Sequence, residues 1–152
     1  MFHFGEVLIV IQKTAMFHII YVSYAVTPFS QLELEDLLAK ARKHNSEVGI
    51  TGILFYRNGN FLQVIEGEEA AVKALYASIR RDLRHRAVIT LFEEPIAARE
   101  FADWSMAFRD LDRNPEQIPE GFNDLFNKNV ANMDLKAFSS KVRVFISEMC
   151  DL

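Results

Sequence analysis

Hydrophobic residues recur along the chain with two different periods, one of two residues and one of three to four. The segments of period two are rich in Ile, Val, Tyr and Phe and therefore predict β-strands. Two of them are joined by Asn58-Gly59, a dipeptide typical of a two-residue hairpin turn. The predicted strands span residues 17–24, 49–56, 60–66, 87–92 and 104–108.

Two other segments repeat their hydrophobic residues every three or four positions and predict amphipathic helices. The first begins at Ser30, which has the spacing of a capping box with Glu33, and is expected to extend to about Lys43. The second is expected from about Glu68 to Leu83. Their inward-facing residues are predicted to be Leu34, Leu37, Leu38 and Ala41 in the first helix and Val72, Leu75, Tyr76 and Ile79 in the second.

The order of these elements indicates the fold. It runs strand, helix, strand, strand, helix, strand, and ends with one further strand. This order predicts an α+β, ferredoxin-like sandwich in which one sheet carries both helices on a single face. Each helix is expected to connect two parallel strands through a right-handed crossover.

The two ends of the chain differ from this central pattern. Residues 1–15 are interpreted as an N-terminal extension, residues 16–110 as the main domain, and residues 111–152 as a linker followed by two helices. The last helix, expected at about 133–149, repeats hydrophobic residues at spacings of three and four, which suits packing on another apolar surface. That surface is either the open face of the same sheet or a second protein.

Composition and charge narrow the class of protein. Half of the 152 residues are hydrophobic, enough for a packed core, and a net charge of −4 gives no electrostatic reason to expect nucleic-acid binding. The apolar run at 7–11 is too short for a membrane span and lacks the features of a secretory signal. The single cysteine, Cys150, excludes an internal disulfide, so a soluble cytoplasmic protein is expected.

Gln63 departs most clearly from the hydrophobic pattern. It lies in the middle of a predicted strand, on the same face as Phe61 and Ile65. If that face is buried, the amide needs partners, because an unpaired buried polar group costs about 1–3 kcal/mol. The partner is either a protein group or a bound polar ligand.

Conventional enzyme motifs are missing from the sequence. The four histidines have no paired metal-ligand spacing, and no serine elbow or glycine-rich phosphate loop is present. The remaining candidates are polar or aromatic residues on core-facing segments, namely Tyr21, Asn45, Gln63, Trp104 and Met106. Taken singly, each has a structural explanation, such as a core tyrosine, a helix C-cap or simple packing.

Taken together, these residues lie in a frame that resembles a known family. The segments that carry the likeness are Ile20-Tyr21-Val22-Ser23, Arg42-Lys43-His44-Asn45, Gly49 to Tyr56, Phe61 to Gly67, Asp82-Leu83-Arg84-His85 and Phe101 to Met106. In this order they resemble a BLUF domain, a blue-light sensor that uses flavin, over about residues 16–110. The family has a ferredoxin-like fold, in agreement with the fold predicted above.

The resemblance implies a flavin held without a covalent bond between the two helices, usually FAD, with FMN and riboflavin as alternatives. The flavin ring would lie against Tyr21 and Gln63. Asn45 matches the asparagine that meets the polar edge of the pyrimidine part of the ring, and His44 matches a position beside the ring. The site residues that the resemblance further implies are Ser23, Leu54 and Ile79.

The resemblance places Asp82, Arg84 and His85 at the ribityl and phosphate end of the flavin, where the guanidinium of Arg84 suits a phosphate. The alternative is that these three residues form a solvated helix end. The chain also departs from some relatives, because Val64 stands where they carry tryptophan. Trp104 is therefore the only tryptophan of this sequence.

The resemblance finally implies a photochemical cycle in place of an enzymatic reaction. Tyr21 gives an electron and then a proton to the excited ring and receives both back, and Gln63 is left rotated or tautomerised. Trp104 and Met106 would relay the change to the C-terminal helices. The protein is expected to form a homo-oligomer and to act on a downstream protein partner. The rival functions are a small flavin-dependent reductase and a flavin-free, ferredoxin-like regulatory module.

Overall fold

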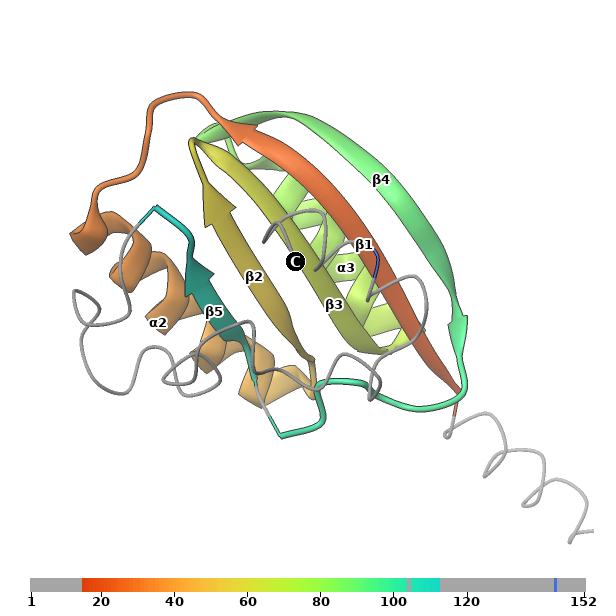
Figure 1. Cartoon of the computed structure of the whole chain (residues 1–152). Coiled ribbons are helices and arrows are strands. Elements are labelled where there is room, and N and C mark those ends of the chain that lie inside the picture. The colour runs from red at the N-terminus through yellow and green to blue at the C-terminus, as the bar shows by residue number, and fades with distance from the viewer. Residues whose placement is uncertain (1–14, 104, 113–143, 145–152) are drawn as a thin grey trace, which may run out of the picture.

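The computed structural model describes residues 15–103, 105–112 and 144, and it shows a five-stranded sheet with two helices (Figure 1). The strands are arranged in the order β4-β1-β3-β2-β5. The elements are β1 (Met16–Ala25), α2 (Gln31–Val48), β2 (Thr51–Arg57), β3 (Asn60–Glu68), α3 (Glu69–Arg81), β4 (His85–Ile96) and β5 (Ala107–Asp110).

Strand directions confirm the predicted ferredoxin-like sandwich. β1 pairs antiparallel with both β3 and β4, and β2 pairs antiparallel with β3. Therefore β1 runs parallel to β2 across β3, and β3 runs parallel to β4 across β1. Helices α2 and α3 connect these two parallel pairs. The additional strand β5 pairs parallel with β2 at one edge of the sheet.

The first helix begins as predicted but ends later. The Ser30 side chain accepts from the Glu33 backbone, and the Glu33 side chain accepts from the Ser30 backbone, so the capping box is complete. The predicted end near Lys43 is wrong, because α2 continues to Val48. It stops at Gly49, whose φ of 72° lies in the left-handed region that glycine adopts without steric cost. Asn45 therefore lies inside the helix and is not its C-cap.

The predicted hairpin between β2 and β3 is confirmed. Asn58 and Gly59 both have positive φ angles, 50° and 78°, as a type I′ turn requires. The turn sets a register in which Leu54 lies opposite Gln63. Position 52 has room only for glycine, because a Cβ atom there would lie 2.0 Å from the carbonyl oxygen of Val64.

The region after β4 differs from the prediction. β4 extends to Ile96, and β5 begins at Ala107, so the predicted strand at 104–108 is wrong in its first half. Ser105 and Met106 are not in strand conformation, and side chains of other elements bind the backbone groups of Glu100, Phe101 and Ser105. Met106 thus lies immediately before β5, and Trp104 lies outside the described residues.

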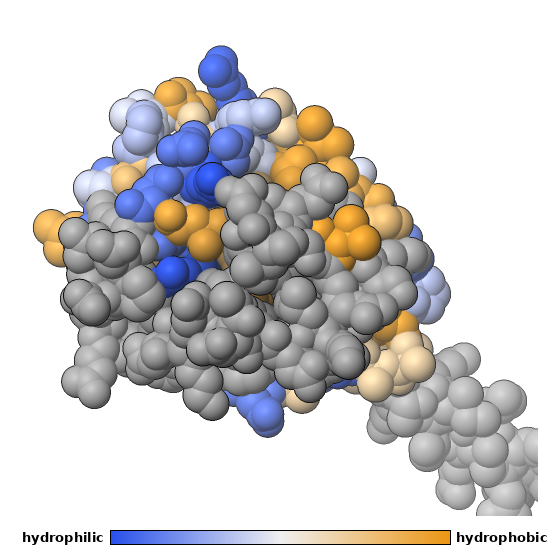
Figure 2. Space-filling view, in the orientation of Figure 1, coloured by the Kyte–Doolittle hydropathy of each residue, from blue (hydrophilic) through white to orange (hydrophobic). Residues whose placement is uncertain are grey.

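The hydrophobic core on the helix side of the sheet contains residues from both helices and all but one of the strands, including Ile19, Leu38, Ile65, Val72 and Phe108. Hydrophobic side chains also reach the surface over β4 (Figure 2), where Ile89 is 52% exposed. No helix among the described residues is long and apolar enough to cross a membrane. The extension at 1–15, apart from Ala15, and the two predicted C-terminal helices lie outside the described residues, except for Val144.

Candidate functional site

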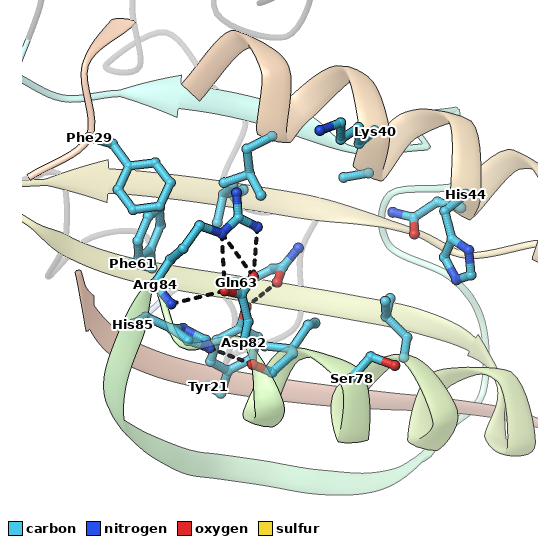
Figure 3. Close-up of a pocket in the computed structure, with 16 residues that line it drawn as sticks. Tyr21, Phe29, Lys40, His44, Phe61, Gln63, Ser78, Asp82, Arg84 and His85 are labelled. Carbon is cyan, nitrogen blue, oxygen red and sulfur yellow. Dashed lines mark hydrogen bonds and ion pairs between the residues drawn. The ribbon is translucent and has the colours of Figure 1, made fainter. Parts of the chain in front are cut away.

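A cavity of about 280 Å³ lies between α2 and α3 over the middle strands of the sheet (Figure 3). One wall comes from α2, with Lys40 and His44, and the opposite wall comes from α3, with Ser78, and from Asp82 directly after this helix. The remaining lining residues are Tyr21, Phe29, Leu37, Ala41, Asn45, Leu54, Phe61, Gln63, Leu75, Ile79, Arg84 and His85.

Tyr21 and Gln63 form the polar centre of the cavity floor. They lie directly opposite each other on β1 and β3, and the Tyr21 hydroxyl donates a hydrogen bond to Gln63 Oε1. The Gln63 amide nitrogen donates to the Met106 sulfur at 3.4 Å. Both side chains are buried, with 4% and 6% exposed. The expected conflict between Gln63 and its apolar neighbours is thus resolved by a phenol and a thioether.

Burial raises the pKa of the Tyr21 phenol, and the neighbouring Tyr76 and Asp82 act in the same direction. The Tyr76 ring packs beside Tyr21, with centroids 5.3 Å apart, and its hydroxyl is hydrogen-bonded to Thr90 at 2.6 Å. A phenol in this environment stays neutral at physiological pH. Tyr21 is therefore a hydrogen-bond donor with its proton in place.

Asn45 has an unsatisfied acceptor. Its Nδ2 donates to the carbonyl oxygen of Ser105 at 2.8 Å, whereas its buried Oδ1 has no hydrogen-bond partner among the described residues. Asn45 is only 1% exposed, so water does not readily satisfy this oxygen. Because such a group costs about 1–3 kcal/mol when unpaired, a ligand in the cavity that donates a hydrogen bond would be favoured here.

The other end of the cavity is charged and open to solvent. Asp82 and Arg84 form an ion pair of 2.6 Å, and the Arg84 guanidinium lies 5.7 Å from the centre of the Phe29 ring. The hydrogen bond from Arg84 lowers the pKa of Asp82. Lys40 is paired with Asp36 at 2.9 Å. Two cations, Arg84 and Lys40, are thus among the residues that line the cavity.

His85 connects the strands to the end of α3. One ring nitrogen is hydrogen-bonded to Ser23 Oγ at 2.9 Å, and the other to the carbonyl oxygen of Ile79. Ser23 is 1% exposed but is not among the residues that line the cavity. These contacts give His85 a structural role at the cavity mouth.

The structure brings most of the predicted site residues to one cavity. Nine of them line it, namely Tyr21, His44, Asn45, Leu54, Gln63, Ile79, Asp82, Arg84 and His85. Met106 reaches the site through Gln63, and Ser23 reaches it through His85. The residues not predicted for the site were Phe29, Leu37, Lys40, Ala41, Phe61, Leu75 and Ser78.

A signal for several of these additional residues was present in the sequence. Leu37, Lys40, Ala41 and His44 follow helical spacing on α2, as do the lining residues of α3. Extending the helical faces that contain His44 and Ile79 would have found them. Phe29 lies in the connection before α2, where no periodicity applies.

The arrangement suits a ligand with three chemical parts. Apolar walls suit a flat ring system, the buried phenol and two amides suit polar atoms on its edge, and the cations at the mouth suit an anionic tail. The fold and the cavity together define a ferredoxin-like module for binding a small aromatic cofactor.

The chain belongs to the BLUF family, described as sensors of blue-light using FAD, whose family model matches residues 16–107. It is 40% identical over 87 residues to photoactivated adenylate cyclase subunit beta of Euglena longa. This match covers 57% of the chain but 10% of that relative, so the chain spans about a tenth of the relative's length.

Solved structures show the same fold. The dark-state structure of BlrB, a BLUF protein, superimposes with a TM-score of 0.62 at 32% identity, covering 66% of this chain and 76% of BlrB. BlrP1 of Klebsiella pneumoniae, solved with FMN and cyclic diGMP, gives a TM-score of 0.60 at 35% identity and covers 64% of this chain and 26% of BlrP1.

Proposed function

We propose that this protein is a blue-light photoreceptor that binds a flavin without a covalent bond in the cavity between α2 and α3. The observation that carries the proposal is the buried hydrogen-bonded series from Tyr21 through Gln63 to Met106 along the cavity floor. Family membership supports it, because the family is described as sensors of blue-light using FAD.

The residues of the cavity fit a flavin. The unpaired Oδ1 of Asn45 suits the ring N–H of the pyrimidine part, and the amide of Gln63 suits a ring carbonyl. Leu54 and Ile79 provide apolar contacts for the ring. Arg84 and Lys40 at the mouth suit the phosphate of FAD or FMN. FAD is the flavin named for the family, and BlrP1 was solved with FMN.

A bound flavin supplies light absorption and, when excited, a site for one electron. Tyr21 is the donor that we propose, because its phenol is buried beside the cavity and holds its proton. Loss of an electron makes a phenol strongly acidic, so the Tyr21 proton leaves through its hydrogen bond. The electron and the proton then return to Tyr21, and the cycle has no net oxidation.

Gln63 converts this transient charge into a lasting change. At present its oxygen faces Tyr21 and its nitrogen faces Met106. A rotated amide turns its N–H groups toward the Tyr21 oxygen and its own oxygen toward Met106. A tautomerised amide keeps its position and offers an O–H donor to Tyr21 in place of an acceptor. In the rotated arrangement the Met106 sulfur loses its N–H donor, and the change reaches β5 through the backbone that follows Met106.

We infer that the output is contact with a protein partner, and that the chain works as a cytoplasmic homo-oligomer without enzymatic activity of its own. The matched relatives include photoactivated adenylate cyclase subunits, in which light sensing and a cyclase occur together. β5 is the natural exit for the signal, because it follows Met106 directly and lies at the sheet edge.

The decisive experiment is an absorption spectrum taken in the dark and again after blue illumination. The wild-type protein should be yellow, and its flavin band should shift reversibly to longer wavelength. Tyr21→Phe should bind flavin and lose the shift. Tyr24→Phe is the matched control, because Tyr24 is 50% exposed and should behave as wild type.

Three outcomes would contradict the proposal. A normal shift in Tyr21→Phe would remove the assigned donor. Rapid bleaching by a nicotinamide donor would favour the flavin-dependent reductase. A protein that stays colourless after reconstitution with FAD and FMN would favour the flavin-free regulatory module.

A further inference from the structure

Glu66 is a buried carboxylate that the proposed photochemistry does not use. It is fully buried, with 0% exposed, and lies three residues after Gln63 on β3. Because side chains alternate along a strand, Glu66 is on the sheet face away from the cavity. Its backbone lies opposite His18 on β1 and Thr51 on β2.

The Glu66 carboxylate binds the backbone of the connection between β4 and β5. The N–H groups of Glu100 and Phe101 donate to its two oxygens at 2.9 and 2.7 Å. The Thr51 hydroxyl donates to the same carboxylate at 2.8 Å. Hydrogen bonds of this charge-assisted kind are about twice as strong as neutral ones.

Arg99 reinforces this attachment from the same connection. Its guanidinium donates to Thr51 Oγ1 at 3.0 Å and to the carbonyl oxygen of Gly49 at 2.7 Å. It also donates to the backbone oxygen of Glu66 at 3.4 Å. We call Glu66, Thr51 and Arg99 with these bonds the Glu66 anchor.

The far end of the same connection is held at the cavity. Asn45 donates to the Ser105 carbonyl at 2.8 Å, Arg42 donates to the Met106 carbonyl at 2.9 Å, and Gln63 donates to the Met106 sulfur. The described residues of this connection, 99–103 and 105–106, are therefore attached at one end to Glu66 and at the other end to the residues around Gln63. One strand, β3, provides both Gln63 and Glu66.

We propose that Glu66 is a positioning residue of the photocycle, whose anchor keeps Met106 against Gln63 and so favours return from the lit arrangement to the dark one. This inference rests on the proposed photoreceptor function. When Gln63 rotates, its donor to Met106 is lost, and the anchor, together with the bonds from Asn45 and Arg42, still holds residues 99–103 and 105–106 in the dark position. A weaker anchor leaves less free energy to drive the return.

Glu66→Gln tests the anchor, because its amide NH₂ cannot accept from a backbone N–H that the carboxylate oxygen now binds. In the dark, with or without flavin, hydrogen exchange at the Glu100 and Phe101 amides should become faster by about tenfold. After illumination, thermal recovery should become slower by about three- to tenfold. Glu69→Gln, on the solvent-exposed side of α3, is the matched control and should change neither rate.

Combining Glu66→Gln with Met106→Leu tests whether the slower recovery depends on the Met106 side chain. In Met106→Leu, which removes the sulfur acceptor, Glu66→Gln should change recovery by less than about twofold, because coupled residues are not additive. An equal factor in both backgrounds, or recovery in Glu66→Gln that is unchanged or faster, would overturn the inference.

Arg99→Met replaces the first variant if Glu66→Gln does not fold, since Arg99 lies near the surface and its removal leaves the carboxylate in place. It should slow recovery by about two- to threefold, and an unchanged rate would overturn the inference. If the wild type shows no light-induced shift, the photoreceptor function itself fails. If the wild type shifts normally and the anchor variants recover at its rate, only the role of Glu66 fails.

Discussion

The two ends of the cavity differ in burial and in charge. At the inner end, Tyr21, Asn45 and Gln63 are each at most 6% exposed. Tyr21 and Gln63 are hydrogen-bonded to each other, and Asn45 Oδ1 has no partner among the described residues. At the mouth, the side chains of Arg84 and Asp82 are 51% and 32% exposed and pair with each other. The inner end is neutral and dry, whereas the mouth is charged and solvated.

This difference teaches where a switch can be placed. When a buried hydrogen bond changes partners, any group left unpaired raises the free energy of that arrangement, because no water is present to replace the lost partner. An exposed ion pair is screened and readily replaced by water, and it contributes about 0–1 kcal/mol. We therefore expect the inner end to determine the photochemistry and the mouth to determine only how tightly the cofactor is held.

The largest effect is expected at the inner end from Gln63→Leu. Leucine fills nearly the same space but has neither donor nor acceptor, so no second hydrogen-bonding arrangement exists. The variant should bind flavin and show no light-induced red shift in a difference spectrum. Gln31→Leu at the start of α2 is the control. A residual shift of wild-type size would show that the switch lies elsewhere.

Asn45→Ala should affect binding more than it affects folding. Flavin affinity should fall by about ten- to a hundredfold, because one hydrogen bond to the ring is lost in a dry site. Stability of the flavin-free protein should change little, since the substitution loses the bond to Ser105 but also removes the unpaired oxygen. Titration calorimetry and thermal unfolding measure the two quantities. Unchanged affinity would exclude Asn45 from the flavin site.

At the mouth, Arg84→Gln should distinguish flavins by their tails. Affinity for FMN and FAD should fall by about three- to tenfold, whereas affinity for riboflavin, which has no phosphate, should stay the same. The red shift should keep its size. Arg86→Gln, exposed on β4, is the control. Equal losses for riboflavin and FMN would mean that Arg84 acts on the ring or on the fold.

The smallest effect concerns the Asp82–Arg84 ion pair. Since the folded-state pKa of Asp82 is lowered from its ordinary value of 3.8, the pair stabilises the fold above pH 3.8 and loses this contribution as the pH falls through the lower folded value. The free energy of unfolding of the wild type should exceed that of Asp82→Asn by at most about 1 kcal/mol at pH 7, and this difference should vanish in acid. Urea unfolding across this pH range measures it, and a larger difference in acid would contradict the assignment.

Much of the fold could be predicted from the sequence because its signals are local. The Ser30 cap, the Asn58-Gly59 turn and the alternation around Gln63 depend on neighbouring residues alone. The end of α2 was missed because Ser46, Glu47 and Val48 carry no stop signal and only Gly49 ends the helix. The start of β5 was missed because Glu66 and Asn45, far away in the sequence, hold the preceding backbone out of the sheet.

The site shows the same division. Gln63 was found because it interrupts a hydrophobic segment, whereas Tyr21 and Asn45 were found because they match a family pattern. Lys40 and Ser78 were missed because a polar residue on a helix is ordinarily solvated, and only the packing of α2 against α3 places these two at a cavity. At the mouth, Asp82, Arg84 and His85 were found through the same family pattern.

The position of β3 in the sheet limits how far a light-induced structural change can spread. β3 is the third of five strands, and both of its edges are hydrogen-bonded, to β1 and β2 (Figure 1). Its main chain has no freedom to bend without breaking two ladders at once. We therefore expect crystals of the dark and lit forms to share one backbone for β1, β2 and β3, with any visible displacement beginning after Ile96.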